Sequence, residues 1–457
     1  MNIIDAIRYH SRMRPYDMAV IHPGGAVTYL QLANIIAQLA VKLRSHGIAA
    51  DRTAAIYVTD PFLHLALILA CSANATTSIS AHPNYDPIPA AAEIDHYIAD
   101  RDLAFAGPTP LVTVGPNWIA EASQETSAQL MSSPSRPPQS IVRKFTSSGT
   151  TGTPKVIGYT RAAAHSMTTL GLSVEPLTQG PNLSMMGLST IGGYGTANGT
   201  LWHGATLVLA VSPAQVLRAM SLYGVASLQA SPQQLQGLVE LVRSRSIRLP
   251  SLRRIEVGGA TLPTSVALAA RATLCPNVVG VYGATEAGGI SKAPASVLQH
   301  HPDAAGYILP DVEVQILDDA GQVAAPGVEG VVRVRVPDMP DRYLGDPEVS
   351  ALAWRDGWFH PGDVGLIMAD GLLRITGRVD EMINAGGVKL SPVLVDDFLL
   401  TQPGIREAAA FAFRQPGLPD LVYAAVVCDE AAFDEQAVLA ACRGRLNSRA
   451  PVRLVRL

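Results

Sequence analysis

The 457-residue sequence has few charged and few aromatic residues. Asp, Glu, Lys and Arg make up 16% of the chain and aromatic residues 5%, whereas an average soluble domain is roughly 25% charged. The 34 basic and 38 acidic side chains nearly cancel, which gives a formal net charge of -4. Because a nucleic-acid groove or a membrane-binding arm needs a basic excess, we expect neither nucleic acid nor a membrane as a partner.

Cysteine is scarce as well. The four cysteines, Cys71, Cys275, Cys428 and Cys442, form no CxxC pair and have no histidine cluster nearby. Tetrahedral metal sites need ligands grouped at such spacings, so the pattern excludes a common zinc centre. It predicts free thiols in a reducing cytosol.

Long apolar runs are absent too. The longest, such as Leu65 to Cys71 and Leu421 to Cys428, fall well short of the ~20 residues that a membrane span needs. The first fifteen residues hold Asp5 and three arginines, without the apolar core of a signal peptide. We therefore expect a cytoplasmic location, and at about 150 residues per domain the length indicates two or three domains.

The first part of the chain alternates between helical and strand patterns. Residues 27–48 carry apolar side chains at helical spacing, residues 53–58 form a short apolar run, and residues 61–75 are helical again. Residues 123–140, rich in Ser, Gln and Pro, indicate a surface connection. This order predicts strand–helix units packed into a layered α/β domain.

The remaining two thirds predict three kinds of structure. Residues 161–290 alternate short apolar runs with helical stretches, which favours a largely parallel sheet covered by helices. Residues 310–336 show residue-by-residue alternation and turn signals, which indicates antiparallel strands. The residues after 377 are enough for a small α+β domain. The predicted fold is thus α/β, with layered subdomains, a β-rich subdomain and a small C-terminal domain.

A run of small hydroxyl and glycine residues occupies residues 146–155. Glycines let backbone N–H groups approach phosphate oxygens, six hydroxyls add donors, and Lys155 supplies a positive charge. The run is not the common P-loop, because Pro154 precedes the lysine and Val156 follows it. Taken alone it fits a flexible linker as well as a phosphate loop.

A second candidate is the segment Tyr282, Gly283, Ala284, Thr285 and Glu286, at the end of an apolar run. Ligands of open α/β sheets bind at the carboxyl ends of strands, so a glycine turn with a hydroxyl and a carboxylate could hold a base and a magnesium ion. Most such turns are only turns.

A third candidate follows further on. Asp363 in the segment 357–363 could accept two ribose hydroxyls, and Arg378, fifteen residues later, could bind the same sugar or a phosphate. Taken singly, each side chain fits a solvated surface equally well.

Taken together, these segments resemble the adenylate-forming superfamily, which includes acyl-CoA and aryl-CoA synthetases, firefly luciferase and the adenylation domains of nonribosomal peptide synthetases. The resemblance covers nearly the whole chain in motif order and spacing. It is carried by GGAVTYLQLA, TSSGTTGTPK, VGGATL, YGATE, RYLGDPE, GWFHPGDVG and GRVDEMINAGGVKLSP.

The resemblance implies two half-reactions. A carboxylate attacks the α-phosphorus of ATP to give an acyl-adenylate and pyrophosphate, and a thiol of coenzyme A or of a carrier phosphopantetheine then takes the acyl group. Such chemistry needs positioning and charge neutralisation more than a protein nucleophile. The implied partners are a small carboxylic acid and, where a carrier is the acceptor, a separate acyl carrier protein.

The resemblance also assigns roles to matching positions. Lys155, Thr285 and Glu286 would be catalytic, with Thr285 on the α-phosphate and Glu286 on Mg²⁺. The residues that would hold the β- and γ-phosphates are Thr146, Ser147, Ser148, Gly149, Thr150, Thr151, Gly152 and Thr153, with Lys155. Those that would flank adenine are Gly258, Gly259, Ala260 and Tyr282, with Gly283 beside them. Asp363 and Arg378 would hold the ribose, and Gly386 and Gly387 would face the thiol tunnel.

The resemblance implies an AMP-binding domain over residues 1–379 and a small mobile domain over residues 380–457, with Asp380 at the hinge. Two departures qualify the expected activity. Thr190 stands where the family commonly has a gate histidine. The sequence also stops at RAPVRLVRL, before the usual segment with the adenylation lysine. The alternative expectation is a member that only forms the thioester, or a non-catalytic member that binds acyl groups or nucleotide.

No Asp or Glu occurs from Pro181 to Val239, where the acyl pocket should lie. Relatives that activate amino acids use a carboxylate there to hold the α-ammonium. An uncharged acyl or aryl acid is therefore favoured as the substrate over an α-amino acid.

Overall fold

The computed structural model describes residues 2–81, 87–124, 136–147, 154–174, 180–210, 212–385, 388–414, 420–429 and 432–457. The chain divides into two compact units. The first holds residues 1–313 and 334–359, and the second holds residues 314–333 and 360–457. The domain boundary expected at residues 379 and 380 stays a prediction.

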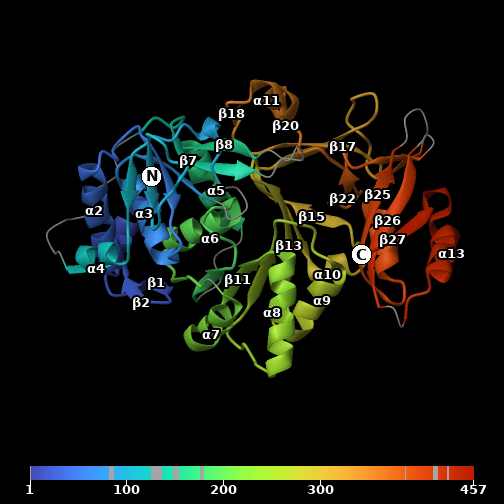
Figure 1. Cartoon of the computed structure of the whole chain (residues 1–457), viewed down its shortest axis with the longest axis horizontal. Coiled ribbons are helices and arrows are strands. Elements are labelled where there is room, and N and C mark those ends of the chain that lie inside the picture. The colour runs from blue at the N-terminus through green and yellow to red at the C-terminus, as the bar shows by residue number, and fades with distance from the viewer. Residues whose placement is uncertain are drawn as a thin grey trace. The chain divides into compact units, whose positions relative to one another are not determined.

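A seven-stranded sheet forms one layer of the first unit (Figure 1). Its strands, in spatial order, are β18 (Tyr343–Leu344), β8 (Lys155–Thr160), β7 (Ile141–Ser147), β4 (Thr77–Ser80), β3 (Thr53–Tyr57), β5 (His96–Ala99) and β6 (Leu111–Thr113). The pairs from β7 to β6 are parallel, whereas β8 is antiparallel to both of its neighbours. The carboxyl end of β7 and the start of β8 therefore lie side by side at one end of the strands.

The helices packed near this sheet follow from their sequence patterns. They are α1 (Ile3–Met13), α2 (Tyr29–Ser45), α3 (Pro61–Ala73), α4 (Asn117–Gln124) and α5 (Arg161–Val174). Helix α2 begins at a capping box in which Thr28 and Gln31 bond to each other's backbone N–H groups, and α3 begins with Pro61 after the N-cap Asp60. The expected strand at residues 53–58 and helices at residues 27–48 and 61–75 are confirmed.

A second sheet of the first unit has a parallel centre. Nine of its strands, in spatial order, are β15 (Ala304–Ile308), β14 (Gly288–Pro294), β13 (Val278–Ala284), β12 (Arg254–Val257), β11 (Ser227–Ala230), β9 (Asn182–Ser184), β10 (Leu207–Val208), β1 (Met18–His22) and β2 (Gly25–Thr28). The pairs from β13 to β1 are parallel. The chain turns antiparallel at both flanks.

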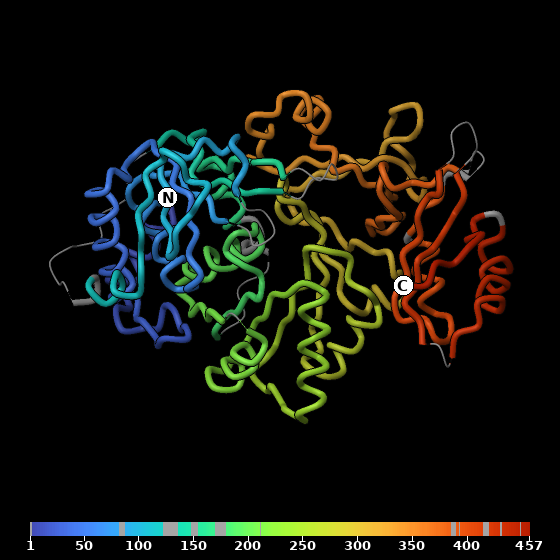
Figure 2. Tube along the Cα trace, in the orientation of Figure 1, coloured from blue at the N-terminus to red at the C-terminus, as the bar shows by residue number. Residues whose placement is uncertain are grey.

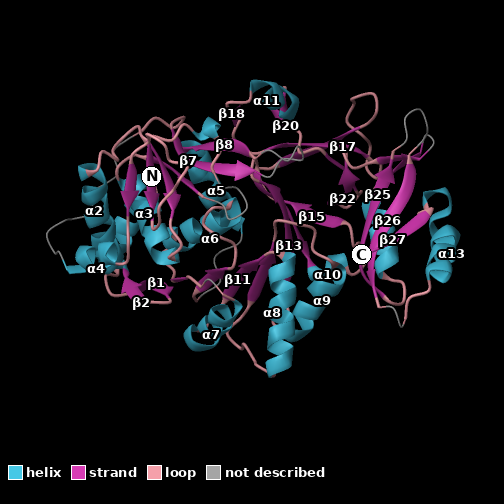
Figure 3. Cartoon of the chain, viewed as in Figure 1, coloured by secondary structure: helices cyan, strands magenta, loops and turns pink. Residues whose placement is uncertain are grey.

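Helices also flank this second sheet: α6 (Ile191–Trp202), α7 (Pro213–Tyr223), α8 (Pro232–Arg245), α9 (Thr264–Thr273) and α10 (Ala295–Leu298). Figure 3 shows α7, α8 and α9 beside strands β11 and β13. In Figure 2 the blue N-terminal hairpin lies beside the green chain, in keeping with the pairing of β1 and β10. The parallel, helix-covered sheet expected over residues 161–290 is confirmed.

Residues 313–359, which are divided between the two units, are rich in short strands. Their elements are β16 (Glu313–Leu317), β17 (Gly330–Arg335), α11 (Pro347–Ala353), β19 (Trp354–Arg355) and β20 (Trp358–Phe359). Val334 of β17 pairs antiparallel with Phe359 of β20. The antiparallel strands expected near residues 310–336 are therefore present.

The described residues of the second unit contain the antiparallel pair β21–β22, a two-stranded sheet, a three-stranded sheet and two main helices. The elements are β21 (Asp363–Ile367), β22 (Leu372–Arg378), β23 (Ile383–Ala385), β24 (Val388–Leu390), α12 (Pro392–Leu400), β25 (Ile405–Phe413), β26 (Leu421–Cys428), α13 (Glu435–Leu446) and β27 (Arg453–Arg456). An apolar cluster from Ile383 to Leu454 forms its core. The mixed content confirms the expected α+β character.

None of the helices in the described part of the chain is long and apolar enough to cross a membrane.

Candidate active site

The hydroxyl-rich loop leaves the first sheet at Thr146 and Ser147, the last two residues of β7. Both hydroxyl oxygens are buried and have no hydrogen-bond partner among the described residues. A buried hydroxyl without a partner is costly, and a phosphate oxygen is a suitable acceptor for it. Residues 148–153 of the predicted loop lie outside the described residues.

The chain re-enters the sheet beside the end of β7, because Lys155 is the first residue of β8 and pairs with Ser147. Its Nζ atom lies 4.9 Å from the ring centroid of Tyr343, which is within the range of a cation–π contact. Tyr343 belongs to β18, the next strand, where it pairs with Ile157. The ring thus supports the ammonium group at the mouth of the loop.

The YGATE segment runs through the end of β13 and the following turn. Tyr282 and Gly283 lie within the strand, whereas Thr285 and Glu286 lie between β13 and β14. A Cβ atom at Gly283 would stand 2.3 Å from the carbonyl oxygen of Gly288. Only glycine fits this close approach, so the residue is required for the turn that carries Thr285 and Glu286.

Two tyrosines fix this turn. Tyr343 donates its hydroxyl to Oε1 of Glu286 at 2.8 Å, and Tyr159 of β8 donates to the Thr285 carbonyl oxygen at 2.9 Å. Glu286 and Tyr343 are each 7% exposed. Burial, and then the charge of Glu286, raise the pKa of Tyr159, so it stays a neutral donor. The first unit therefore holds Lys155 and Glu286 on Tyr343, and the neighbouring Thr285 on Tyr159.

The sequence did not single out Tyr343 as a functional residue. It stands in the RYLGDPE segment, which served only as a landmark. Its contacts depend on the pairing of β18 with β8, which joins segments almost two hundred positions apart. No local signal reports such a pairing.

The glycine segment 258–260 follows β12 at its carboxyl end. The Gly258 N–H donates to the Ala230 carbonyl oxygen, and a Cβ atom on Gly258 would lie 3.5 Å from the carbonyl oxygen of Val281. Gly259 adopts a φ of +88°, which favours glycine. This segment thus lies beside the strand that carries Tyr282.

Thr190, at the position of the expected gate histidine, is the N-cap of α6. Its hydroxyl donates to the Gly187 carbonyl oxygen at 2.8 Å and accepts from the Gly193 N–H at 3.1 Å. A Cβ at Gly193 would meet the Gly187 carbonyl oxygen at 2.3 Å, so the loop and the helix touch through backbone. The hydroxyl closes the loop onto the helix start.

Gln229 lies near this loop on β11. Its Oε1 accepts hydrogen bonds from the hydroxyls of Ser184, at 2.8 Å, and Thr196, at 2.7 Å. With both donors on Oε1, the two N–H donors of the amide are directed elsewhere. A Cβ on Gly192 would lie 3.4 Å from Nε2 and 3.0 Å from Sδ of Met186, so Gly192 leaves the amide open on that side.

A fully buried arginine supports the same loop from the first sheet. Arg143 of β7 is 0% exposed and donates to Ser78, at 3.0 Å, to Ser80, at 2.6 Å, and to the Leu188 carbonyl oxygen, at 3.0 Å. Its guanidinium also lies about 5 Å from the rings of Phe145 and Tyr194. Burial lowers the pKa of Arg143 to about 10, so it is charged at neutral pH.

The second unit holds the predicted ribose ligands as a pair. Asp363 begins β21 and Arg378 ends β22, and the two residues face each other in the hairpin. Arg378 Nη1 donates to Asp363 Oδ1 at 3.0 Å, and its Nε donates to Asp380 Oδ1 at 3.3 Å. Gly386 and Gly387, expected at the thiol tunnel, lie outside the described residues.

The donors of the first unit suit a nucleotide with Mg²⁺. No group of three His, Cys, Asp or Glu side chains able to hold a metal occurs within the described ranges. Magnesium commonly needs only one or two carboxylates, with phosphate oxygens and waters completing its shell. Glu286 can offer its second oxygen while Oε1 stays on Tyr343, and Thr146, Ser147 and Lys155 present donors to phosphate.

Fold and motif positions together define an adenylate-forming enzyme, and comparisons with known proteins agree. The structure superposes on the amide bond synthetase McbA from Marinactinospora thermotolerans with a TM-score of 0.89 at 27% identity, over 100% of this chain and 95% of that one. A feruloyl-CoA synthase of Amycolatopsis sp is 28% identical over 95% of this chain and 91% of its own length. An indoleacetate–CoA ligase of Aromatoleum aromaticum is 28% identical over 93% of this chain and 88% of its own.

The profile of one family, described as AMP-binding enzyme, matches residues 7–344. The chain belongs to this family. The predicted superfamily and fold class are confirmed, and the chain is an acyl-CoA synthetase-like enzyme. Neither a member that only forms the thioester nor a non-catalytic member is favoured, because the relatives are named as ligases and synthetases.

Proposed function

We propose that this protein uses ATP to activate a carboxylic acid as an acyl-adenylate and then transfers the acyl group to a thiol of coenzyme A or of a carrier protein. The observation that carries the proposal is that Tyr343 contacts both Lys155 and Glu286, while Tyr159 holds the neighbouring Thr285 through its carbonyl oxygen. A cation and a buried carboxylate at this spacing provide the charge neutralisation that phosphoryl chemistry needs.

In the first half-reaction, Lys155 and the hydroxyls of Thr146 and Ser147 would hold the departing pyrophosphate. The Thr285 hydroxyl would contact the α-phosphate, while Tyr159 holds the Thr285 backbone in place. Bound Mg²⁺ would neutralise phosphate charge from its place on Glu286. The segment 258–260 and Tyr282 would flank adenine.

Asp363 and Arg378 are proposed as ribose ligands, with the Arg378 guanidinium orienting the carboxylate through the 3.0 Å hydrogen bond. Gly386 and Gly387 are proposed to face the thiol. The second half-reaction needs no further protein nucleophile, since the incoming thiol itself attacks the acyl carbon, the bond from that carbon to the phosphate oxygen breaks, and AMP leaves with the thiol proton lost to water.

The acid is proposed to be uncharged apart from its carboxylate and to carry a hydrogen-bond acceptor. The segment from Pro181 to Val239 has no carboxylate to hold an ammonium group. Gln229 already accepts two hydroxyl hydrogen bonds, so its amide N–H donors remain for an acceptor such as a hydroxyl, ether or keto oxygen. Aryl and acyl acids with such a substituent fit this neutral, small-residue surface.

The test is turnover of the full chain with ATP, Mg²⁺ and a panel of carboxylic acids, followed by pyrophosphate release and by the mass of the acyl product. Coenzyme A, a phosphopantetheine-loaded carrier and a simple amine serve as competing acceptors, because McbA is named an amide bond synthetase. We expect pyrophosphate release and a thioester. Amide formation without thioester would overturn the choice of acceptor. ATP binding without pyrophosphate release, whichever acid of the panel is added, would overturn the proposal.

Glu286→Gln provides the variant arm. It keeps the shape of the side chain but removes the charge, so pyrophosphate release should fall by about a hundredfold or more. Glu240→Gln, an exposed carboxylate on α8, is the matched control and should leave the rate unchanged. Equal rates in both variants would contradict the magnesium role of Glu286.

A further inference from the structure

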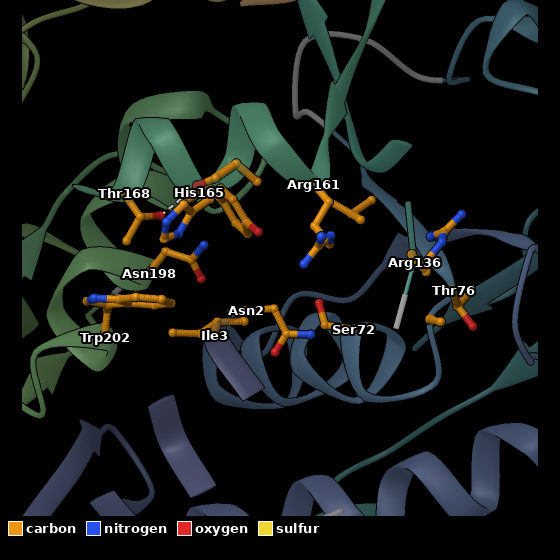
Figure 4. Close-up of a pocket in the computed structure, with 14 residues that line it drawn as sticks. Asn2, Ile3, Ser72, Thr76, Arg136, Arg161, His165, Thr168, Asn198 and Trp202 are labelled. Carbon is orange, nitrogen blue, oxygen red and sulfur yellow. Dashed lines mark hydrogen bonds between the residues drawn. The ribbon is translucent and has the colours of Figure 1, made fainter. Parts of the chain in front are cut away.

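A cavity of about 60 Å³ lies in the first unit, among α1, α3, α5 and α6, and Figure 4 shows the side chains around it. None of its lining residues belongs to the phosphate loop, the YGATE segment or the neighbourhood of Gln229. The polar side chains that line it include Asn2, Ser72, Arg136, Arg161 and His165. The cavity is therefore distinct from the proposed reaction site.

Two arginines present unpaired nitrogens there. Nε and Nη1 of Arg136 and Nε of Arg161 are buried and have no hydrogen-bond partner in the described ranges. Figure 4 shows the Arg161 side chain reaching into the cavity toward Asn2 and Ser72, with Arg136 at one end. Buried guanidinium N–H groups cost free energy unless an acceptor reaches them, so these donors call for an oxygen ligand.

The charge balance around the cavity is positive. Arg136 lies 3.5 Å from Asp51, but that carboxylate is 85% exposed and its attraction is screened by water. Burial lowers the pKa of His165, and nearby positive charges, Arg161 included, lower it further against the pull of Asp338. Two cations thus face one cavity without a buried carboxylate among its lining residues.

The size and the lining of the cavity limit which ligands it can hold. At about 10–15 Å³ per water molecule, 60 Å³ holds roughly four to six waters, which is enough for a small oxyanion and too little for a nucleotide. In Figure 4, Trp202 and Ile3 lie on the side away from Arg136, together with Thr168, His165 and Asn198. Arg161 lies between this side and Arg136 in the same view.

We propose that this cavity is a second binding site of the enzyme, which takes a small oxyanion, a phosphate or a short carboxylate, on the guanidinium groups of Arg136 and Arg161. Guanidinium forks match the oxygen pairs of both anions. Strand β8 begins with Lys155, at the phosphate loop, and Arg161 directly follows its last residue. The anion would therefore bind at the end of β8 that lies away from the phosphate loop.

The experiment is calorimetric titration of the full chain with inorganic phosphate, acetate and neutral acetamide. Titrations are repeated on Lys155→Ala, which removes the lysine of the phosphate loop, and on Arg161→Gln, Arg161→Lys and Arg218→Gln. Arg218 is exposed on α7 and controls for the loss of one positive charge. Thermal unfolding of each variant checks that it is folded.

We expect saturable binding of phosphate, acetate or both, but not of acetamide. Arg161→Gln should weaken it by about ten- to a hundredfold, as expected for the loss of hydrogen bonds from a charged donor. Arg161→Lys should retain part of the affinity, Arg218→Gln should retain all of it, and Lys155→Ala should still show the binding that Arg161→Gln weakens. Binding to phosphate alone or to acetate alone identifies which oxyanion the site prefers.

Three results would overturn the proposal. One is the absence of saturable binding, which would make this a hydrated cavity only. The second is binding abolished by Lys155→Ala and untouched by Arg161→Gln. The third is equal binding of acetamide and acetate. If Arg161→Gln does not fold, Arg161→Lys takes its place, and an unchanged affinity of Arg161→Lys for both anions would overturn the proposal.

Discussion

Tyr343 donates its hydroxyl hydrogen to Oε1 of Glu286 over 2.8 Å, and the face of the same ring lies 4.9 Å from Lys155 Nζ. One side chain thus touches both the proposed magnesium carboxylate and the proposed phosphate cation. The two charges are held apart by an aromatic ring instead of meeting in a salt bridge. Each therefore stays available to a ligand of the opposite charge.

Tyr343→Phe removes the hydroxyl and keeps the ring. Glu286 then loses a hydrogen bond to a charged acceptor, worth about 1.5–3 kcal/mol, and its carboxylate is free to turn. We expect the Mg²⁺ concentration for half-maximal pyrophosphate release to rise about tenfold. Tyr29→Phe is the control, since Tyr29 donates a comparable bond to the Ala205 carbonyl oxygen elsewhere in the core. An unchanged Mg²⁺ requirement in Tyr343→Phe would refute the role.

Lys155→Ala should lower kcat/KM for ATP by about a hundred- to a thousandfold, because a preorganised cation opposite developing phosphate charge is lost. Lys42→Ala is matched to it, since Lys42 lies over the ring of Trp118 at 4.3 Å and is remote from the loop. Steady-state kinetics with varied ATP measures both. Parallel losses in the two variants would indicate general damage instead of a phosphate contact.

Gln229→Leu should change the choice of acid more than the overall rate. The substitution removes the amide donors, so acids that carry a hydroxyl, ether or keto group should lose about tenfold or more in kcat/KM, while plain hydrocarbon acids keep theirs. The ratio of kcat/KM between a hydroxylated and an unsubstituted aryl acid measures the change. A constant ratio would show that Gln229 does not meet the acid.

Arg143→Ala should lower the free energy of unfolding by about 3 kcal/mol or more. It opens a cavity at a fully buried position and removes the donors to Ser78, Ser80 and the Leu188 carbonyl oxygen. Chemical denaturation, followed by fluorescence, gives the value. Arg218→Ala on the surface should change it by less than about 0.5 kcal/mol. A loss this small at Arg143 would mean that its hydrogen bonds bring no net stability.

Acid should destabilise the first unit through His64. Burial, followed by the charge of Arg143, lowers the pKa of His64 to about 3, and its Nε2 lies 2.6 Å from the Ser80 hydroxyl. Between pH 6.5 and about 3 the unfolded chain holds a proton that the folded chain does not. The free energy of unfolding should therefore fall with decreasing pH, by up to about 1.4 kcal/mol per unit.

His64→Gln tests this pH dependence directly. The variant lacks the titrating group, so its unfolding free energy should fall less steeply below pH 6.5 than that of the parent. Denaturation series at several pH values between 4 and 8 give both slopes. Identical slopes would assign the acid sensitivity to other groups.

Features that depend on neighbouring residues could be predicted from the sequence. The helix that begins at Tyr29 follows from its capping box and apolar periodicity, and the close turn at Gly283 follows from a glycine between a strand and two polar residues. The phosphate role of the hydroxyl-rich segment that ends at Lys155 rests on its composition and stays a prediction. In each case a few adjacent residues contain both the cause and the effect.

Features that depend on distant pairing could not be predicted. Tyr343 reaches Glu286 only because β18 lies against β8. The cavity at Arg161 is built from segments that begin near residue 2 and end near residue 202. In the sequence, Thr190 stands at the position of the expected gate histidine. In the structure its hydroxyl caps α6.

The pairing of β1 with β10 also bears on how the chain folds during synthesis. Val20 and Ile21 find their parallel partners at Leu207 and Val208. At about 5–20 residues per second, a ribosome needs roughly 10 to 40 s to make the intervening chain. During that interval one edge of β1 has no strand to pair with. A nascent chain stalled before residue 208 should therefore depend on chaperones that shield exposed strand edges.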